Sequence, residues 1–413
     1  MRASVIETAG NSRGIKIHNR LLVRNTIREH APIARHEIAK LTGLTASAVT
    51  VIVNELMGLG ILREVGHGKS SGGRRPVMLE LNARAGYIFA VRLQRGEFAA
   101  ALLDLAGGVL EKQFKRLDTS SPETVAEAVE QAFRTITRSV GVSSGDVLWC
   151  GVASPGLIDS SCGMLERSYN LQWDHVPLGM ILSTRLDNIP VHVENTSNAA
   201  AFAEKEYGSG RGSANLLYIS LSVGIGGGII IGGEIYGGAR GYAGEIGHTA
   251  LISDGGPACT CGSSGCFEAL CSVKAVLNRI KAEVPEATFK RYGLSAAKIT
   301  MDNFVLPPVA EIPEVQKIIR ETGRYTGIMI ANLANTFNPD LVILGGELAR
   351  AGEIFIKAVK KEVKERTLNQ IEEAVQVVRS TMMEDPALMG AYALALGNIF
   401  AIDEWRKGRR QSS

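Results

Sequence analysis

The sequence predicts an α/β protein in which an N-terminal winged helix-turn-helix module precedes a body of two α/β lobes. Three observations support this fold class. The first segment is basic, it contains three short helices followed by a hairpin, and the remainder repeats one order of strands and helices. We expect the module to span residues 1–82, the first lobe residues 83–190 and the second lobe residues 191–413, with a last helix that returns to the first lobe.

The composition is that of an ordinary globular protein. Of the 413 residues, 45% are apolar and 21% are charged, which is enough to bury a large core. At ~100–200 residues per domain, the length predicts two or three domains. No apolar run approaches the ~18 residues of a membrane span, and the N-terminus lacks the apolar stretch of a signal peptide. We therefore expect a cytoplasmic protein with no membrane contact and with its six cysteines reduced.

Charge is distributed unevenly along the chain. Residues 1–82 contain 12 lysines and arginines against 6 acidic residues, whereas residues 83–413 contain 33 against 36. A basic module joined to a mildly acidic body places a polyanion-binding surface at the N-terminus. The basic stretch at residues 405–410 is interpreted as a tail, and a second contact with nucleic acid is the alternative.

The module follows the order helix, helix, glycine turn, helix. Helices are predicted over residues 19–30 and 35–41, and a third begins after the N-cap Thr45 and runs to about residue 59. Apolar residues of the third helix recur at steps of three and four and form one stripe. This pattern is typical of a helix-turn-helix, whose second helix enters the major groove of double-stranded DNA. A set of helices that only packs together is the alternative.

Candidate DNA contacts lie on the third helix and on the loop that follows it. The outward residues of the helix carry small side chains that can hydrogen-bond to base edges and phosphates, namely Thr45, Ser47, Thr50 and Asn54. Strands predicted over 61–65 and 77–81 flank a glycine-rich basic loop, in which the candidates are Lys69, Arg74 and Arg75. Because the third helix has no Lys or Arg, we expect the wing and the first helices to supply the charge and the DNA site to be rich in A·T pairs.

The body repeats one pattern. Three strands, a helix and a buried strand are predicted first over 87–93, 98–103, 109–114, a helix capped by Ser121, and 147–153. The same order returns with strands over 216–221, 227–231, 234–236 and 341–344. We infer two similar lobes with a cleft between them, and a final helix over 387–400 that packs across both.

One histidine and three cysteines have the spacing of a metal site. His248, Cys259, Cys261 and Cys266 form a tetrahedral zinc set, and four protein ligands leave no open position, so the zinc is expected to be structural. A disulfide or a coincidence of spacing is the alternative.

Carboxylates lie beside these ligands. Glu245 precedes His248 by three residues, and Glu268 follows Cys266 by two. Zinc would hold both carboxylates toward the cleft, where they can accept hydrogen bonds from a polyhydroxylated ligand. Asn195, which follows a strand predicted over 191–194, could complete the set. The alternative is that both glutamates are surface charges.

These residues resemble the ROK family of repressors, open reading frames and sugar kinases. The resemblance covers nearly the whole chain and rests on Gly73-Arg74-Arg75-Pro76, residues 169–173 (Tyr-Asn-Leu-Gln-Trp), residues 194–199 (Glu-Asn-Thr-Ser-Asn-Ala), residues 245–248 and the cysteine loop. It implies an actin-like, ribonuclease-H-like fold with structural zinc and a sugar site formed by Asn195, Glu245, His248 and Glu268. His248 would then both ligate zinc and orient the sugar, and the loop at 154–156 is a weaker candidate for contact.

The sequence departs from the kinases of the family at two places. Those kinases have an aspartate, the general base, where this chain has Thr196, whose hydroxyl is not a usable base near neutral pH. They also begin the body with an Asp-x-Gly-Gly-Thr phosphate loop, and the corresponding residues 91–96 here include Arg92 and Arg95. A glycine-rich turn over 222–228 remains and is weak evidence for a nucleotide, and there is no P-loop motif.

The resemblance and these departures imply a non-enzymatic, sugar-responsive transcription regulator. The expected role is repression of a carbohydrate catabolic operon, with xylose slightly favoured over glucose and N-acetylglucosamine, in a homodimer or homotetramer. One alternative is a sugar kinase with an accessory DNA-binding domain. Another is a DNA-binding protein whose effector is a second protein.

Overall fold

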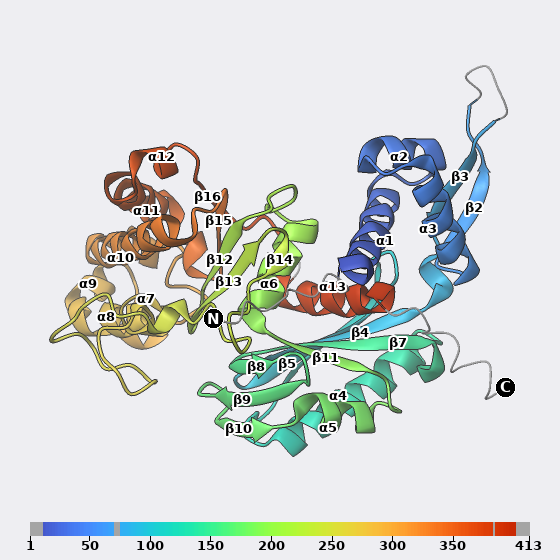
Figure 1. The fold of residues 1–413 in the computed structure, drawn as a ribbon. Helices are drawn as coiled ribbons and strands as arrows, with labels where there is room; N and C mark the ends of the chain where they lie inside the picture. Colours follow the sequence, from blue (N-terminus) through green and yellow to red (C-terminus); the bar gives the residue numbers. More distant parts are fainter. Residues whose placement is uncertain (1–10, 70–74, 383–384, 402–413) are drawn as a thin grey trace, which may run out of the picture.

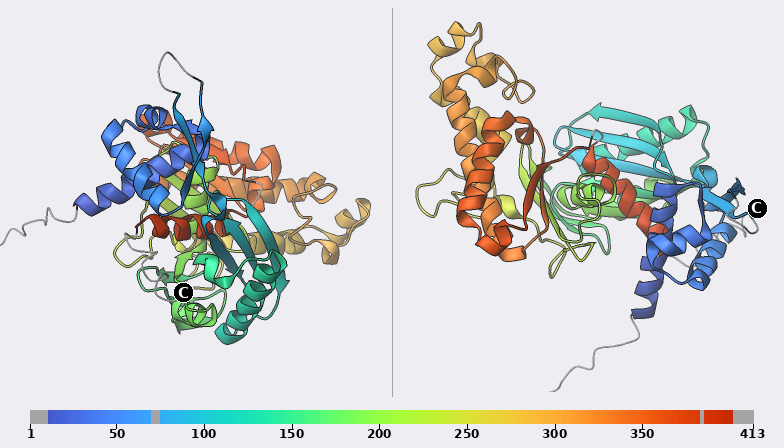
Figure 2. Two further views of the ribbon diagram at one scale, coloured as in Figure 1. Left: turned by 90° about the vertical axis from the view of Figure 1, so that its right-hand side faces the viewer. Right: turned by 90° about the horizontal axis from the view of Figure 1, so that it is seen from above.

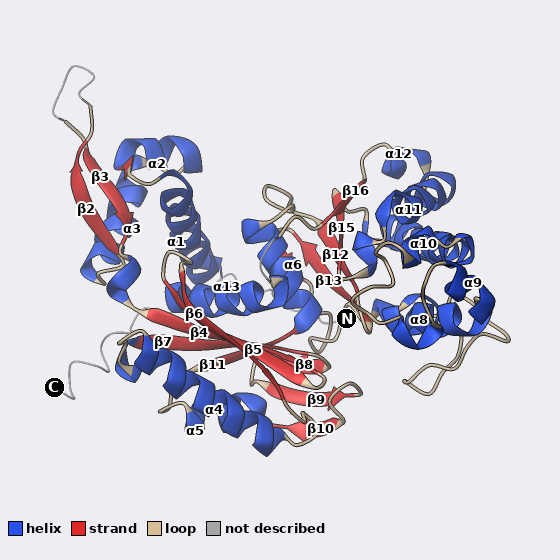
Figure 3. Cartoon of the chain, turned by 180° about the vertical axis from the view of Figure 1, so that it is seen from behind, coloured by secondary structure: helices blue, strands red, loops and turns tan. Residues whose placement is uncertain are grey.

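The computed structural model describes residues 11–69, 75–382 and 385–401 and has three parts (Figure 1). A small N-terminal module lies beside the first of two lobes, and each lobe contains a five-stranded sheet. The views from above and from behind show two helices between the lobes and the other large helices on the outer sides (Figures 2 and 3). The predicted fold class, a winged module followed by a two-lobed α/β body, is confirmed.

The module contains the predicted helix-turn-helix and hairpin. Its elements are α1 (Asn11–His30), α2 (Arg35–Thr42), α3 (Ala46–Gly58), β1 (Ile33–Ala34), β2 (Leu62–His67) and β3 (Val77–Leu81). The strands form an antiparallel sheet in the order β1-β3-β2. The sequence does not predict β1, because two residues carry no alternation of their own and pair only through β3. Helix α1 also begins eight residues earlier than predicted.

The first lobe is built on a sheet in the order β11-β7-β4-β5-β6. Its strands are β4 (Tyr87–Gln94), β5 (Glu97–Asp104), β6 (Val109–Arg116), β7 (Val147–Ser154) and β11 (Val191–Asn195). Helices α4 (Pro122–Ser139) and α5 (Leu178–Arg185) cover the outer face, and a small sheet contains β8 (Leu157–Asp159), β9 (Met164–Ser168) and β10 (Trp173–Val176). The boundary predicted after residue 190 is wrong at this point, because β11 pairs in parallel with β7 and belongs to the first sheet.

The second lobe repeats that topology. Its strands are β12 (Leu216–Leu221), β13 (Ile225–Ile231), β14 (Glu234–Ile235), β15 (Leu341–Gly345) and β16 (Gln376–Arg379), in the order β14-β13-β12-β15-β16. In both sheets the first three strands are antiparallel and the last two join them in parallel, so the predicted repeat of elements corresponds to a repeated topology. The helices of this lobe are α7 (Phe267–Cys271), α8 (Val273–Glu283), α9 (Glu286–Arg291), α10 (Pro313–Phe337), α11 (Gly352–Arg366) and α12 (Asn369–Glu372).

Two helices, α6 (Thr196–Tyr207) and α13 (Pro386–Ala401), lie between the sheets. They cross closely because Gly390 has no side chain: a Cβ atom there would lie 1.8 Å from the carbonyl oxygen of Ala199. On the other side, Cβ atoms at Gly226 and Gly228 would lie 2.2 and 2.3 Å from atoms of Ser197. The glycine-rich turn predicted over 222–228 is therefore mostly strand β13, in which Gly226 and Gly228 make room for α6 and Gly227 makes room for Ile246.

The module and the first lobe share one hydrophobic core. Val23 and Ile27 of α1 belong to the same buried cluster as Ile88 of β4 and Leu396 of α13. Helix α13 packs across both lobes, as predicted for the last helix, and it also contacts the module, which the sequence did not predict. Within the described part of the chain, no single helix meets the length and hydropathy needed to cross a membrane, although α2 and α3 meet them jointly across a bend of 118°.

Candidate metal centre and ligand site

The four predicted metal ligands form one cluster. The candidate ligand atoms of His248, Cys259, Cys261 and Cys266 all lie within 4.8 Å of one another. Nδ1 of His248 is 3.6 Å from Sγ of Cys259, and the Sγ atoms of Cys261 and Cys266 are 3.8 Å apart. Ligands that lie ~2.0–2.3 Å from a tetrahedral zinc are separated by roughly 3.3–3.8 Å, so this donor set fits the ion. A disulfide would need the sulfur atoms at about 2.05 Å.

Backbone hydrogen bonds fold the cysteine loop around this cluster. The N–H of Cys259 donates to the carbonyl of Ser263, and the N–H of Gly265 donates to that of Pro257. Gly265 has φ +69°, and a Cβ atom there would lie 2.0 Å from the carbonyl oxygen of Ile252, so this turn requires glycine. Burial raises the pKa of Cys266 to about 12. A bound cation would offset this cost and stabilise the thiolate.

The orientation of His248 separates its two ring nitrogens. Because Nδ1 faces Cys259, Nε2 is directed to the other side, where it lies 3.9 Å from Oε2 of Glu245. Partial burial raises the pKa of Glu245; the nearby His248 lowers it, and the nearby carboxylate of Glu268 raises it further. A metal-bound imidazole is neutral and carries its proton on the free nitrogen, so Nε2 can donate a hydrogen bond beside the carboxylate.

The carboxylate of Glu268 already accepts hydrogen bonds within the protein. Its Oε2 accepts a hydrogen bond of 2.9 Å from the backbone N–H of Ile225, and its Oε1 is 3.4 Å from the hydroxyl of Thr260. A Cβ atom at Gly224 would lie 2.8 Å from the same Oε2, so a larger residue there would displace the carboxylate. The remaining lone pairs of Glu268 are available to a ligand hydroxyl.

Asn195 has a structural role that the sequence did not reveal. Its Oδ1 accepts the N–H groups of Ser197 and Asn198 at 2.7 and 3.4 Å, so it is the N-cap of α6. Its Nδ2 donates to the carbonyl of Gly156 at 2.9 Å, which ties the loop between β7 and β8 to the same point. One N–H of the amide remains for a ligand. The other three candidates, Glu245, His248 and Glu268, form one group. Among the described residues, no hydrogen bond or ion pair joins Asn195 to this group.

Two residues of the first lobe reach the group formed by Glu245, His248 and Glu268. The ring of Tyr169 lies 6.4 Å from that of His248 in an edge-on arrangement. Nδ2 of Asn170 is 3.8 Å from the position of a Cβ atom at Gly224, next to Glu268. Both residues lie in the turn between β9 and β10, so the group is completed across the two lobes. The segment 169–173 carries the family resemblance, and that signal could have identified them.

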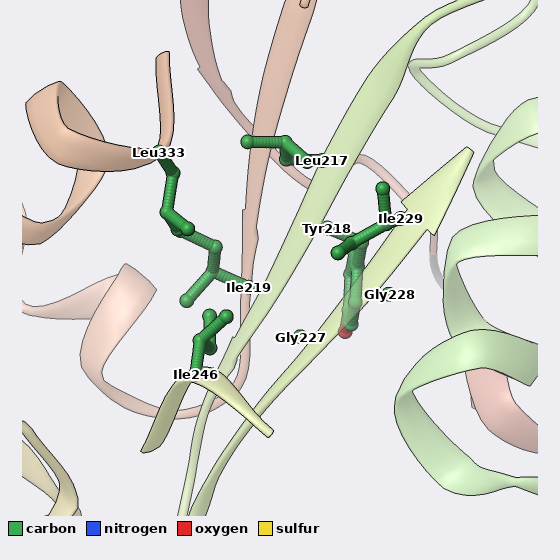
Figure 4. A pocket seen from close by; sticks show the side chains of 8 residues that line it. All are labelled: Leu217, Tyr218, Ile219, Gly227, Gly228, Ile229, Ile246 and Leu333. Atoms are coloured by element: carbon green, nitrogen blue, oxygen red, sulfur yellow. The ribbon is translucent and has the colours of Figure 1, made fainter. Parts of the chain in front are cut away.

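A small apolar recess lies elsewhere, against the second sheet. Figure 4 shows Leu333 of α10 and Ile246, which precedes His248 by two residues, on either side of Ile219. The recess is lined by Leu217, Tyr218, Ile219, Gly227, Gly228, Ile229, Ile246 and Leu333. None of these side chains is charged, and none of the predicted ligand-binding residues is among them.

Some of the candidate DNA-contacting side chains already hydrogen-bond to the backbone of α3, and others are exposed. The Thr45 hydroxyl accepts the N–H of Ala48 at 3.2 Å, as an N-cap does, and the Thr50 hydroxyl donates to the Ala46 carbonyl at 2.7 Å. Ser47 and Asn54 are exposed on α3, and Lys69 and Arg75 are exposed on the wing. Arg74 lies outside the described residues. Val51, which the sequence analysis left out, is 57% exposed on α3, and an apolar side chain there suits a thymine methyl.

Comparisons with known proteins agree with this architecture. A xylose repressor of Caldicellulosiruptor bescii is 31% identical over 401 residues, which cover 96% of this chain and 100% of the repressor. A crystal structure of a ROK family transcriptional regulator, a homologue of the E. coli MLC protein, has a TM-score of 0.78 at 26% identity and covers 94% of this chain and 97% of that one. A ROK family glucokinase of Streptomyces griseus has a TM-score of 0.64 at 29% identity and covers 75% of this chain and 99% of the kinase. The model of the ROK family matches residues 88–398, most of the two-lobed body, and this chain therefore belongs to the ROK family.

Proposed function

We propose that this protein is a sugar-responsive transcription regulator that represses a carbohydrate catabolic operon. The observation that carries the proposal is the fusion of a winged helix-turn-helix to a two-lobed ROK body through a shared hydrophobic core. The full-length match to a repressor named for xylose makes D-xylose the first effector to test. We propose a homodimer or homotetramer, because a two-fold pair of modules matches a pseudo-palindromic DNA site.

The DNA-binding surface is proposed to be α3 and the wing. Ser47 and Asn54 would contact base edges, while Lys69, Arg74 and Arg75 would contact phosphates or the minor groove. Thr45 and Thr50 would act mainly by shaping the start of α3, since their hydroxyls already have backbone partners. This division supports an A·T-rich site, because no guanidinium of α3 is available to guanine.

The sugar site is proposed to consist of Asn195, Glu245, His248 and Glu268. Carboxylate oxygens, an amide N–H and an imidazole N–H offer the mixture of acceptors and donors that sugar hydroxyls require. The cluster of His248, Cys259, Cys261 and Cys266 would hold a structural zinc, whose contribution is to fix the ring of His248. The chain itself then orients Nε2 beside the carboxylate of Glu245.

A kinase role is the alternative, and two features weigh against it. Thr196 begins α6 at the position of the general base of the kinases, and its hydroxyl cannot accept a proton near neutral pH. Arg92 occupies the region that corresponds to their phosphate loop. Its guanidinium is paired with Glu97 at 3.2 Å and with Asp385 at 2.5 Å, so a nucleotide phosphate would have to displace two carboxylates.

The test combines DNA binding with nucleotide turnover. Duplexes selected from random DNA by the purified protein supply the operator probe, and its Kd is measured at one fixed salt concentration with D-xylose, D-glucose or N-acetylglucosamine. We expect one of these sugars to change the Kd at least about fivefold. Absence of any sequence-selective duplex, or sugar-dependent formation of ADP from ATP, would contradict the proposal and favour the kinase.

A further inference from the structure

We propose that helix α6 transmits the occupancy of the sugar site to the DNA-binding module. The inference rests on the proposed function and adds the structural path by which sugar binding would change DNA binding. The first residue before α6 is Asn195, a candidate sugar contact, and its last residues, Glu206 and Tyr207, contact α1 of the module. Twelve helical residues span ~18 Å, so one rigid element joins two sites that are far apart in sequence.

The N-terminal end of α6 depends on Asn195. The side chain caps the helix through the N–H groups of Ser197 and Asn198 and holds the carbonyl of Gly156. A sugar that accepts a hydrogen bond from the remaining N–H of this amide would displace the Asn195 side chain. The start of α6 and the β7–β8 loop, which both bind this side chain, would move with it. The first turn of α6 is therefore directly coupled to the ligand and to the first lobe.

The C-terminal end of α6 contacts α1 through several bonds. Nη2 of Arg28 donates to the backbone carbonyl of Glu206 at 3.0 Å, and Nδ2 of Asn25 donates to the Glu206 carboxylate at 3.2 Å. The guanidinium of Arg28 also lies 4.5 Å from the centre of the Tyr207 ring. The side chains of Arg28 and Glu206 are only 12% and 11% exposed, so water competes weakly for this contact.

Close packing makes α6 move as a unit. Cβ atoms at Gly226 and Gly228 of β13 would overlap Ser197, and one at Gly390 of α13 would overlap Ala199. With β13 on one side and α13 on the other, the helix cannot bend or slide without moving its neighbours. A displacement at Asn195 is therefore carried to Glu206 rather than absorbed along the helix.

The module is built so that α1 passes this displacement to the DNA-binding helix. Arg20 of α1 donates to the carboxylate of Glu55 in α3 from both Nε and Nη2, at 3.0 and 2.8 Å. Val23 and Ile27 of α1 share the core of α3. A change in the position of α1 on α6 thus changes the position of α3 relative to the body, and in a dimer it changes the spacing of the two recognition helices.

The experiment measures the coupling and not only the affinities. For the wild type, the ratio of operator Kd values with and without saturating D-xylose is determined on the selected duplex, and D-xylose affinity is measured by calorimetry. The variants are Arg28→Ala, which removes the contact with Tyr207 and Glu206, and Glu206→Gln, which removes only the charge and preserves the helix. The control is Arg185→Ala, which removes from α5 an arginine paired with Glu127 and Glu130 of α4, away from both sites.

In Arg28→Ala, we expect the ratio of operator Kd values with and without D-xylose to lie at least about threefold closer to one than in the wild type. The affinity for D-xylose and the sugar-free affinity for the operator should each stay within about twofold of the wild type. Glu206→Gln should show a smaller change in the same direction, and Arg185→Ala should retain the wild-type ratio. An unchanged ratio in both variants would overturn the role of α6 and leave the proposed function intact. A wild type whose operator affinity responds to none of the three sugars would overturn the proposed function, and the transmission with it.

Discussion

Nε of Arg92, near the end of β4, lies 2.5 Å from the carboxylate of Asp385, the residue that precedes α13. Oδ1 of the same carboxylate accepts the N–H groups of Ala387 and Leu388 at 3.1 and 3.2 Å, so Asp385 caps the helix while it binds the arginine. Arg92 is only 9% exposed. Arg92 thus fastens the helix that contacts both lobes and the module.

Removal of this pair is expected to destabilise the whole chain. Arg92→Ala leaves the carboxylates of Glu97 and Asp385 without their cation, and we expect a loss of about 2–3 kcal/mol, below the ~3–5 kcal/mol of a fully buried pair because Asp385 is partly exposed. Urea denaturation measures the loss. Arg134→Ala, which breaks an exposed pair with Glu130 on α4, should cost at most about 1 kcal/mol. Equal losses in the two variants would contradict this account.

Restoring a carboxylate at the base position is not expected to restore phosphoryl transfer. Thr196→Asp would place an aspartate where the family resemblance puts the general base of the kinases, but Arg92 would remain paired with Glu97 and Asp385 in the stretch that the resemblance compares with their phosphate loop. A coupled assay for ADP with D-glucose and D-xylose should therefore remain at the background of the wild type. A sugar-dependent rise of tenfold or more would show that the base alone separates this chain from an enzyme.

The cysteine cluster is expected to support sugar binding and not DNA binding. Cys266→Ser removes one of the four ligands, so we expect the purified variant to lose its zinc, measured by elemental analysis, and to bind D-xylose at least tenfold more weakly by calorimetry. Operator affinity without sugar should stay within about threefold of the wild type, because the hydrophobic core that the module shares with the first lobe contains none of the four cluster residues. Cys162→Ser changes an exposed cysteine outside the cluster and should keep both the metal and the sugar affinity.

A buried carboxylate on α6 predicts how stability changes with pH. Burial raises the pKa of Glu204, whose Oε2 accepts the N–H of Ser209 at 2.8 Å. The folded chain therefore keeps a proton that the unfolded chain releases above its ordinary pKa. This contribution to stability is fully present below that ordinary value and is lost as pH rises through the raised one. Glu204→Gln should flatten the stability curve in that window, whereas Glu353→Gln, at an exposed carboxylate, should follow the wild type.

Local patterns predict most of the fold. Strand β12 has the predicted bounds, Thr45 and Ser121 are the predicted N-caps, and the repeat of strands and helices gives two sheets of the same order. Strand β11 was assigned to the wrong lobe because its partner β7 is about 40 residues earlier, and no local signal records a parallel pairing. The predicted strand began at residue 227, and Gly226 was placed in a turn, because the sequence shows the absence of a side chain but not helix α6, which fills the space.

The candidate site was predicted less completely. Spacing alone identifies His248 and the three cysteines, because the loop that joins them is short. Tyr169 reaches His248 from the other lobe, and only the tertiary structure brings that turn to the cluster. The capping role of Asn195 also follows from its position at the junction of β11 and α6, which periodicity cannot place to the residue.

The crossing of α6 and α13 provides the sharpest test of the packing. Gly390→Ala places a methyl group 1.8 Å from the carbonyl oxygen of Ala199, a backbone atom that cannot rotate away, so the helices must separate. We expect a loss of about 3 kcal/mol or more, at the upper end of overpacking effects. Gly397→Ala is the matched control in the same helix, because a Cβ atom there meets nothing within 4 Å and alanine favours a helix by about 1 kcal/mol. Thermal unfolding should therefore shift in opposite directions in the two variants, and a stable Gly390→Ala chain would mean that α6 and α13 do not lie in this contact in solution.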